Sequence, residues 1–410
     1  MKRIVITGIG TVNALGLDVS SYWDAVRAGH SAVRPISGFD TSGFASKLGA
    51  EVTGFEPSKF IDPMKLRRMD RLSQMVLVSS IEAIKDAGLG SGAIPQERLG
   101  IVIGNGYGGT STTEEFFEGL LLRGPSGVNP MLFPTTVPNS AASLTSIELK
   151  IKGPNSTFCQ KDVSAEEAFI YAVSILRKGV ADAVIAGGGE ELNDVIYHAF
   201  SALGVLSPGF KGGAEGAFPF DSRRNGRVLG EGAGVLVLET SESAMSRGAK
   251  IYAEVAGTAM TGGTAGISSY GLETEPLVRA MGTALNRAGI APSDVDYISA
   301  AANSTRELDA CETRAVKDLF GSRAKSVPIS TIRPMTGDFE GMGGLRLITS
   351  LLSMRDGYIP PTLNYGEPDT GLDLDYVPGN GRNAMVNAVL HNGFGNGGAC
   401  ACIVLKKFKN

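Results

Sequence analysis

Short runs of apolar, often β-branched residues alternate along this chain with longer stretches in which apolar residues recur every three or four positions. The short runs 4–9 and 99–103 predict buried strands, whereas the stretch 70–87 predicts an amphipathic helix that ends at Gly88. Regular alternation of strands and helices predicts an α/β fold. In the first part of the chain we expect strands at 4–9, 99–103, 181–186 and 232–238 and helices at 70–87 and 162–178.

A second series of the same kind begins near Ile251. Two similar α/β series in one chain predict two related halves, 1–250 and 251–410. Because no low-complexity linker separates the halves, we expect them to share an extensive interface. The second series predicts strands at 252–255, 297–301, 327–330, 384–388 and 400–405 and helices at 275–288, 307–319 and 341–354.

Composition narrows the class of protein. The formal net charge of −4 gives no general attraction to nucleic acid or to anionic membranes. The apolar run near the start is too short for a signal peptide, and no apolar stretch reaches the length of a membrane span. The four cysteines follow no zinc or disulfide spacing, so we expect a reduced, cytoplasmic setting. They are Cys159, Cys311, Cys400 and Cys402.

Four ordered motifs lie along the chain. Residues 153–164 read GPNSTFCQKDVS, residues 221–234 read DSRRNGRVLGEGAG, residues 335–338 read MTGD and residues 392–398 read NGFGNGG. Together, and almost end to end, they resemble the motifs of the β-ketoacyl synthase family. The resemblance implies a thiolase-like αβαβα sandwich built from two duplicated halves, in agreement with the two series of elements.

The same resemblance shows that the family's reactive residues are absent. Counted from Gly153, the position of the nucleophilic Cys holds Asp162, and the two His positions hold Ala301 and Asp338. The family's Lys falls on Arg333. The three histidines, His30, His198 and His391, fall on no catalytic position, and we expect His391 to be structural. We therefore expect no catalytic residue and no independent activity.

The absent Cys and His residues are the ones that the family's condensation reaction needs. A decarboxylating condensation needs a thiolate, favoured at a helix N-terminus, and neutral imidazoles that stabilise an enolate. Asp162 suits a helix N-terminus as a capping residue. If Asp338 lies near it, the two carboxylates repel unless a cation intervenes, and we predict that Arg333 or Lys161 pairs with at least one of them. Cys159 is expected to be a buried packing residue in the preceding strand.

Loss of catalysis on a retained scaffold resembles the chain-length factors of bacterial type II polyketide synthases, although their better-known members carry Gln at the position of Asp162. The resemblance implies a heterodimer with an active ketosynthase, in which this subunit shapes the acyl tunnel and sets product length in an aromatic polyketide or aryl polyene pathway. An acyl carrier protein would deliver the phosphopantetheine arm. No cofactor or metal of the protein's own is expected.

Other functions stay open. A divergent β-ketoacyl-[acyl-carrier-protein] synthase or acyltransferase would use Asp162 or Cys159. A homodimeric scaffold would bind carrier protein without a condensing partner. A dinucleotide-binding oxidoreductase would use the glycines at 8–10 or 104–109, but only the second pattern matches loosely, and such a pattern alone is weak.

The resemblance also implies where an acyl chain is measured and where partners bind. Apolar residues at helical spacing in 114–123 would lie near the dimer interface and close the cavity, with plain core packing as the alternative. Asn396 stands at the position of the gating Phe, and Arg227 and Arg306 add charge to the tunnel. The strand 156–160 would pair across the dimer. The cavity candidates are Phe116, Phe117, Leu120, Met131, Phe133 and Thr136.

A cluster of basic residues is a candidate surface for carrier-protein docking, because acyl carrier proteins are acidic. It consists of Lys65, Arg67 and Arg68, with Arg71 nearby. The alternative is a solvated helix face paired with Asp62 and Asp70.

Overall fold

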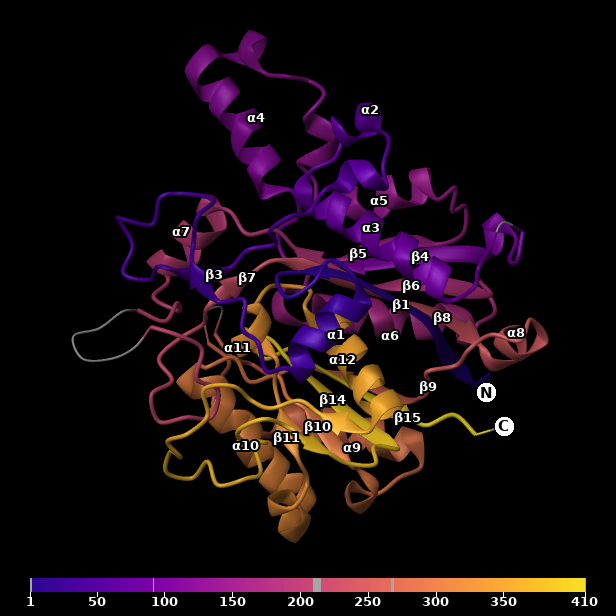
Figure 1. Cartoon of the computed structure of the whole chain (residues 1–410), viewed down its shortest axis with the longest axis vertical. Helices are drawn as coiled ribbons and strands as arrows, with labels where there is room; N and C mark the ends of the chain where they lie inside the picture. Colours follow the sequence, from indigo (N-terminus) through magenta and orange to yellow (C-terminus); the bar gives the residue numbers. More distant parts are fainter. Residues whose placement is uncertain (1, 91, 209–214, 267–268, 410) are drawn as a thin grey trace.

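The structure is a computed structural model that describes residues 2–90, 92–208, 215–266 and 269–409. Its centre is a sheet of ten strands (Figure 1). In spatial order these are β11 (Ile329–Ser330), β10 (Tyr297–Ser299), β14 (Ala388–Phe394), β15 (Cys400–Lys406), β9 (Ala253–Thr261), β1 (Ile4–Asn13), β8 (Gly232–Thr240), β6 (Ala183–Glu190), β4 (Leu99–Gly104) and β5 (Asn155–Phe158).

The sheet has two parts that meet at β1 and β9. These strands pair at only two positions, Val5 with Glu254 and Ile6 with Ala253. Strands from the first part of the chain lie on the β1 side, and strands from the second part lie on the β9 side. Two small sheets flank this framework, one of β2 (Arg34–Pro35), β3 (Leu48–Ala50) and β7 (Leu229–Gly230), the other of β12 (Tyr358–Ile359) and β13 (Arg382–Asn383).

Helices form three layers around these strands. Helices α3 (Arg71–Asp86) and α5 (Ser140–Glu148) cover the outer face of the first part, and α9 (Glu275–Ala288) with α10 (Arg306–Phe320) covers the second (Figure 1). Between them, α6 (Ser164–Arg177) and α12 (Gly343–Asp356) contact strands of both parts. The predicted αβαβα sandwich is confirmed. The other helices are α1 (Val19–Arg27), α2 (Pro63–Leu66), α4 (Thr110–Arg123), α7 (Asp194–Ala202), α8 (Ser241–Ser246) and α11 (Arg333–Thr336).

Local sequence explains the contact between α3 and β1. Asp70 caps α3, because its side chain accepts a hydrogen bond of 2.8 Å from the amide of Ser73. Gly10 in β1 lets the helix approach closely, since a Cβ there would lie 2.0 Å from the carbonyl oxygen of Ser79. Every residue of β1 is buried, as expected of a strand covered on both faces.

Most predicted elements are present, with two informative differences. The predicted strand at 384–388 is wrong: β14 starts only at Ala388, because Met385 is exposed and the continuously buried run is 388–394. The helix predicted from residue 162 starts at Ser164, after a 3-10 turn at Lys161–Val163. That turn places Asp162 just before the N-terminus of α6.

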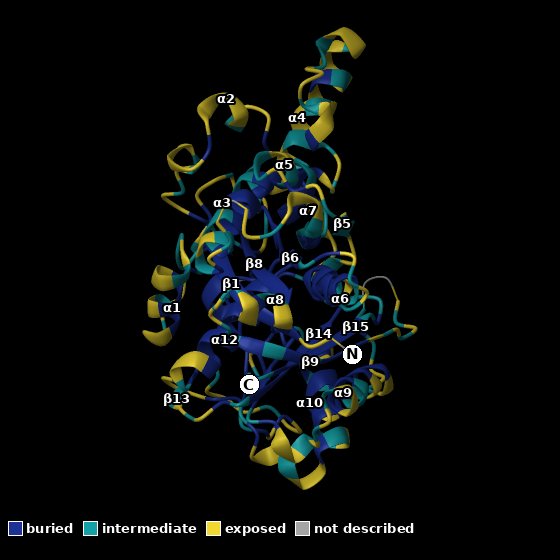
Figure 2. Cartoon of the chain, turned by 90° about the vertical axis from the view of Figure 1, so that its right-hand side faces the viewer, coloured by how far each residue is buried: buried dark blue, intermediate teal, exposed yellow. Residues whose placement is uncertain are grey.

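Helix α4 projects away from the rest of the molecule (Figures 1 and 2). Its outer side chains are solvent-exposed, with Leu121 82% and Leu122 74% exposed. The edge of the ten-stranded sheet nearest to it is β5, which pairs on one side only. An unpaired strand edge and exposed apolar side chains are features of an interaction surface.

Candidate functional site

Asp162 occupies the turn between β5 and α6. Lys161 takes a left-handed φ of 51°, and the carboxylate that follows is buried. Its Oδ2 accepts a hydrogen bond of 3.1 Å from the amide of Asn396. Its Oδ1 lies 3.2 Å from an Nη of Arg227 and accepts a hydrogen bond of 3.3 Å from the hydroxyl of Tyr270. The structure thus places a buried side-chain carboxyl group in the turn that leads from β5 into α6.

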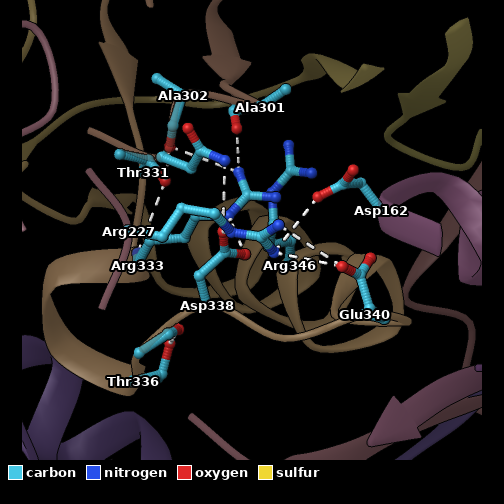
Figure 3. A network of polar contacts seen from close by, with 12 residues as sticks. Asp162, Arg227, Ala301, Ala302, Thr331, Arg333, Thr336, Asp338, Glu340 and Arg346 are labelled. Atoms are coloured by element: carbon cyan, nitrogen blue, oxygen red, sulfur yellow. Dashed lines mark hydrogen bonds and ion pairs between the residues drawn. The ribbon is translucent and has the colours of Figure 1, made fainter. Parts of the chain in front are cut away.

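Arg227 connects this carboxylate to a second one (Figure 3). Its Nε lies 2.6 Å from Oδ2 of Asp338, and its Nη1 lies 3.4 Å from Oε1 of Glu340. Arg333 completes the cluster, with its Nε 2.6 Å from Oδ1 of Asp338. The prediction that Arg333 or Lys161 pairs with one of the two aspartates is confirmed through Arg333. The larger role of Arg227 was not predicted. We call Asp162, Arg227, Arg333, Asp338 and Glu340 the ion cluster.

The pKa values in the ion cluster follow from burial and charge. Burial alone would raise the pKa of the Asp338 carboxyl, but Arg227 and Arg333 hold it below its ordinary value. Burial, reinforced by the negative charge of Asp162, raises the pKa of Glu340 to about 8. Glu340 therefore carries a proton at neutral pH, and two arginines then balance two aspartates. Its Oε2 is buried and has no hydrogen-bond partner among the described residues.

Residues 301–303 also contact the ion cluster. Arg333 donates hydrogen bonds to the backbone oxygens of Ala301 and Ala302 (Figure 3). Asn303 donates from its amide to the hydroxyl of Tyr270 at 2.9 Å and to Asp338 at 3.3 Å. The arginine and the amide thus lie beside Ala301 and Asp338, the residues at the two expected His positions. They are donors of hydrogen bonds and do not titrate near neutral pH.

An inner pocket of about 110 Å³ opens at the cluster. Three members of the ion cluster line it: Asp162, Arg227 and Glu340. Asn396, which we expected at the family's gating position, lines it as well, and its side-chain oxygen is buried without a partner among the residues that the structure describes. The remaining lining residues are Tyr107, Lys161, Phe200, Leu203, Val205 and Tyr270.

Cys159 lies outside the lining of this pocket. The expectation that it is buried is wrong, because it follows the end of the edge strand β5 and is exposed. Its thiol is 3.5 Å from Oδ1 of Asn105, and partial desolvation of this thiol together with the charge of Glu190 raises its pKa. A raised pKa disfavours the thiolate, which is the nucleophilic form.

His391 lies in the core, as expected of a structural residue. Its Nε2 is 3.0 Å from Oε1 of Glu166, and an Nη of Arg346 lies 3.2 Å from the same oxygen. Burial, followed by the charge of Arg346, lowers the pKa of His391 to about 4, so the ring is neutral. It does not line the inner pocket.

The predicted cavity residues lie elsewhere, on and near α4. The rings of Phe117 and Phe133 have centroids 5.7 Å and 5.9 Å from the ring of Phe116. Phe117, Met131 and Phe133 are exposed, and Phe116, Leu120 and Thr136 are half-buried. None of the six lines the inner pocket of this single chain.

Only some residues of the predicted carrier-protein docking cluster are exposed and outside an ion pair. Lys65 pairs with Glu148 at 2.5 Å, whereas Arg67 and Arg68 are exposed. Arg71 is half-buried and pairs with buried Glu231 at 2.6 Å. The alternative pairing is not observed, because Asp62 and Asp70 cap the helices α2 and α3.

Within the described ranges, no group of His, Cys, Asp and Glu side chains is arranged to hold a metal ion. None of the helices described is long and apolar enough to cross a membrane.

Comparison with known protein families identifies the family of this chain. Residues 1–244 match the profile described as "Beta-ketoacyl synthase, N-terminal domain", and residues 252–366 match "Beta-ketoacyl synthase, C-terminal domain". The chain belongs to the β-ketoacyl synthase family. Its relatives include 3-oxoacyl-[acyl-carrier-protein] synthase 2 of Synechocystis sp., 36% identical over 100% of this chain and 99% of the relative. The enzyme of the same name from Coxiella burnetii is 37% identical over 99% of both chains.

Solved structures of β-ketoacyl synthase family proteins agree with the fold. "The ishigamide ketosynthase/chain length factor" has a TM-score of 0.93 and 30% identity, with both chains covered fully. A β-ketoacyl synthase from Burkholderia phymatum STM815 has a TM-score of 0.91 and 30% identity, again with full coverage. A third, described as a type II polyketide synthase acyl-carrier protein in complex with its ketosynthase, has a TM-score of 0.90 and 28% identity over both whole chains.

These comparisons correct the predicted function. The prediction of a chain-length factor is wrong, because full-length relatives at 36% and 37% identity are named 3-oxoacyl-[acyl-carrier-protein] synthase 2. Chain-length factors are named among the structural likenesses, at 30% and 20% identity. The prediction rested on a few substituted positions, Asp162, Ala301 and Asp338, whereas the identity to the synthases extends over the whole chain.

Proposed function

We propose that the protein is a divergent synthase-type acyltransferase that acts on acyl thioesters carried by an acyl carrier protein. Asp162 takes the place of the nucleophile. The observation that carries the proposal is the position of its carboxylate, which lines the inner pocket at the entrance to α6 beside Arg227 and Tyr270. The 3-oxoacyl-[acyl-carrier-protein] synthase 2 relatives support thioester chemistry at this position.

The reaction begins with attack by an oxygen of Asp162 on the thioester carbonyl carbon. The carbon–sulfur bond breaks, its electron pair leaves with the sulfur, and an acyl–aspartyl mixed anhydride forms. Glu340, protonated at neutral pH, supplies the proton that the departing thiolate takes up. Arg227 stabilises the negative charge that develops on the carbonyl oxygen. An acceptor then attacks the same carbon and releases the Asp162 carboxylate. If the acceptor is water, its proton passes to the Glu340 carboxylate. If it is a malonyl thioester, the attacking electron pair comes from the bond that breaks as carbon dioxide leaves, and Glu340 regains its proton from solvent.

Cys159 is the weaker nucleophile in this structure. Its thiol has a raised pKa and does not line the inner pocket. Asp162, in contrast, touches the pocket and is held by charged and polar donors. The two residues lie three positions apart, so substitution of each separates the two assignments cleanly.

The partners follow from the same proposal. An acyl carrier protein would present the thioester on its phosphopantetheine arm, so the protein needs no cofactor of its own. Exposed Arg67 and Arg68 offer positive charge to such an acidic partner. A structure 28% identical to this chain is described as an acyl-carrier protein in complex with its ketosynthase, which supports this pairing. Four unpaired cysteines support a cytoplasmic setting.

We also propose a ketosynthase-like partner chain, docked on β5 and α4. The unpaired edge of β5 and the exposed side chains of Leu121 and Leu122 support this surface. In such a dimer Phe116, Phe117, Leu120, Met131, Phe133 and Thr136 would lie at the interface and border the acyl cavity.

The test is to trap the acyl-enzyme. The protein is mixed with an acyl carrier protein loaded with a butyryl group, quenched in acid and weighed by intact mass spectrometry; peptide mapping then locates the adduct. We expect one acyl group on Asp162, sensitive to hydroxylamine, which is absent in Asp162→Asn and present in Cys159→Ser. Absence of any acyl-enzyme, or an adduct on Cys159, would overturn the proposal.

Supplying malonyl-carrier protein in the same assay identifies the acceptor. Transfer to a carbon acceptor yields a 3-oxoacyl thioester, whereas transfer to water yields the free acid. Either product, lost in Asp162→Asn and kept in Cys159→Ser, supports acyl transfer through Asp162. Turnover that persists in Asp162→Asn contradicts it.

A further inference from the structure

The inner pocket, of about 110 Å³, is small for an acyl-binding site. A dry cavity of about 150 Å³ holds one benzene molecule, so the inner pocket has room for about four or five non-hydrogen atoms. The neighbouring void has only about 10 Å³, and Tyr107, Phe200 and Glu340 line both spaces. Buried Glu190 lines that void as well. A long chain that continued into it would have to displace buried carboxyl groups.

Two side chains of the inner pocket carry buried polar atoms that have no hydrogen-bond partner among the described residues. One atom is Oε2 of Glu340, a residue that is 3% exposed and whose other oxygen lies 3.4 Å from an Nη of Arg227. The other atom is Oδ1 of Asn396. Buried polar atoms are nearly always hydrogen-bonded, so two orphaned atoms in one pocket indicate a ligand that supplies their partners.

A hydroxyl group matches both orphaned atoms. Burial raises the pKa of Glu340 to about 8, so at neutral pH its carboxyl presents a hydrogen-bond donor, whereas Oδ1 of Asn396 presents an acceptor. A hydroxyl accepts from the first and donates to the second; an ammonium group only donates, and a carboxylate only accepts. An apolar chain end in the same place would exclude water from both atoms without replacing their hydrogen bonds, which costs the full desolvation of each.

Both residues lie next to the reacting carboxyl group. The backbone amide of Asn396 donates to Oδ2 of Asp162 at 3.1 Å, and Arg227 contacts both Asp162 and Glu340. An acyl group on Asp162 would therefore start beside the two orphaned atoms.

We propose that the acyl groups this protein takes are short hydroxyacyl groups, which Asn396 and Glu340 select by binding the hydroxyl. That such a group arrives as a thioester rests on the proposed function, whereas recognition of its hydroxyl is measurable without any acyl transfer. When Glu340 gives its proton to the departing thiolate, the hydroxyl turns its own hydrogen towards the new carboxylate, so the two roles of Glu340 are compatible.

The test measures binding of analogues that cannot acylate Asp162. In pantetheine amides, nitrogen replaces the thioester sulfur, and ligand-observed NMR titration gives the Kd. The 3-hydroxypropionyl and butyryl amides have the same number of non-hydrogen atoms and differ only by a hydroxyl in place of a methyl group. We expect the 3-hydroxypropionyl amide to bind at least about tenfold more tightly. Two ordinary hydrogen bonds contribute a factor of about 25, and burial of the methyl group recovers part of it for the butyryl amide.

The hexanoyl amide tests the size limit of the inner pocket. In an apolar tunnel its two extra methylene groups would tighten binding about fifteenfold relative to the butyryl amide. We expect no such gain, because the pocket has no further room.

One substitution tests the selecting residue. Asn396→Leu keeps the size of the side chain and the backbone amide that binds Asp162, but removes the acceptor. The preference for the 3-hydroxypropionyl amide over the butyryl amide should fall about fivefold, the factor of one ordinary hydrogen bond. Asn286→Leu is the matched control, because Asn286 is exposed on α9 and lies outside the inner pocket, and it should leave the preference unchanged.

Equal affinities of the 3-hydroxypropionyl and butyryl amides for the unaltered protein would overturn hydroxyl selection, and so would failure of the 3-hydroxypropionyl amide to bind. A preference that is undiminished in Asn396→Leu would overturn it too. If that variant fails to fold, the comparison of ligands in the unaltered protein decides alone. A preference for the hydroxyl without any acyl-enzyme in the trapping test would contradict only the proposed function. An acyl-enzyme on Asp162 without that preference would contradict only hydroxyl selection.

Discussion

Arg227 is the residue on which the ion cluster depends most. It is 3% exposed and lies between three acidic side chains, those of Asp162, Asp338 and Glu340. Arg227→Met keeps much of the length of the side chain but removes its charge. Asp162 and Asp338 then share only Arg333, and one buried negative charge has no counterion.

The expected loss of stability in Arg227→Met follows from this unpaired charge. Removing one partner of a buried ion pair costs about 3–5 kcal/mol, because the remaining charge is desolvated and unpaired. An unfolding entropy of about 2.1 cal/mol/K per residue amounts to about 0.9 kcal/mol/K for 410 residues. We therefore expect Arg227→Met to lower the melting temperature by about 3–6 °C at pH 7.

A double-mutant cycle with Asp338→Asn isolates the interaction, with melting followed by circular dichroism. The double variant keeps Arg333 opposite Asp162 and is again neutral, so its loss should be smaller than the sum of the two single losses by at least about 1 kcal/mol. Arg98→Met is the matched control, because Arg98 and Asp182 form a pair with side chains 37% and 39% exposed, worth under about 1 kcal/mol. Equal losses in Arg227→Met and Arg98→Met, or additivity in the cycle, would refute the reasoning.

Two further outcomes are expected. Glu340 has a pKa of about 8 in the folded protein against 4.5 ordinarily, so the folded state keeps a proton that the unfolded chain releases. Its contribution to stability is present at low pH and is lost as pH rises towards 8, by up to about 1.4 kcal/mol of unfolding free energy per pH unit. Glu340→Gln should therefore show a shallower decline in melting temperature between pH 5.5 and 8.5, and parallel curves would contradict this. Asp70→Ala removes the cap of α3 and should cost about 1–2 kcal/mol in urea unfolding, whereas an unchanged midpoint would show that the cap is replaced.

Much of the fold could be predicted from the sequence, because apolar spacing follows burial directly. Helix α9 begins and ends at the predicted residues, Glu275 and Ala288. The strand expected at 384–388 failed because composition alone does not distinguish a half-exposed connection from the buried strand that starts at its last residue.

At the site, family motifs placed Asp162, Asp338 and Arg333 together correctly. The partners that decide the chemistry were harder to predict. Arg227 lies 111 residues from Asp338 and was expected only to add charge to a tunnel. Glu340 and Tyr270 were not predicted as site residues. A single acidic residue after an MTGD motif and a tyrosine in a connection belong to no periodic pattern. Their roles come from three-dimensional packing that a one-dimensional pattern does not contain.

The ion cluster also has a consequence for how the two parts of the molecule come together. Asp162 and Arg227 come from the first part of the chain, and Arg333 and Asp338 from the second. A collapsed intermediate in which the parts met in a shifted register would bury these charges unpaired, at a cost of several kcal/mol. Apolar contacts between the middle helices and both parts of the sheet tolerate such a shift more readily, because they are non-directional. The ion cluster therefore favours the native docking of the two parts, because a shifted docking would leave its charges buried without partners.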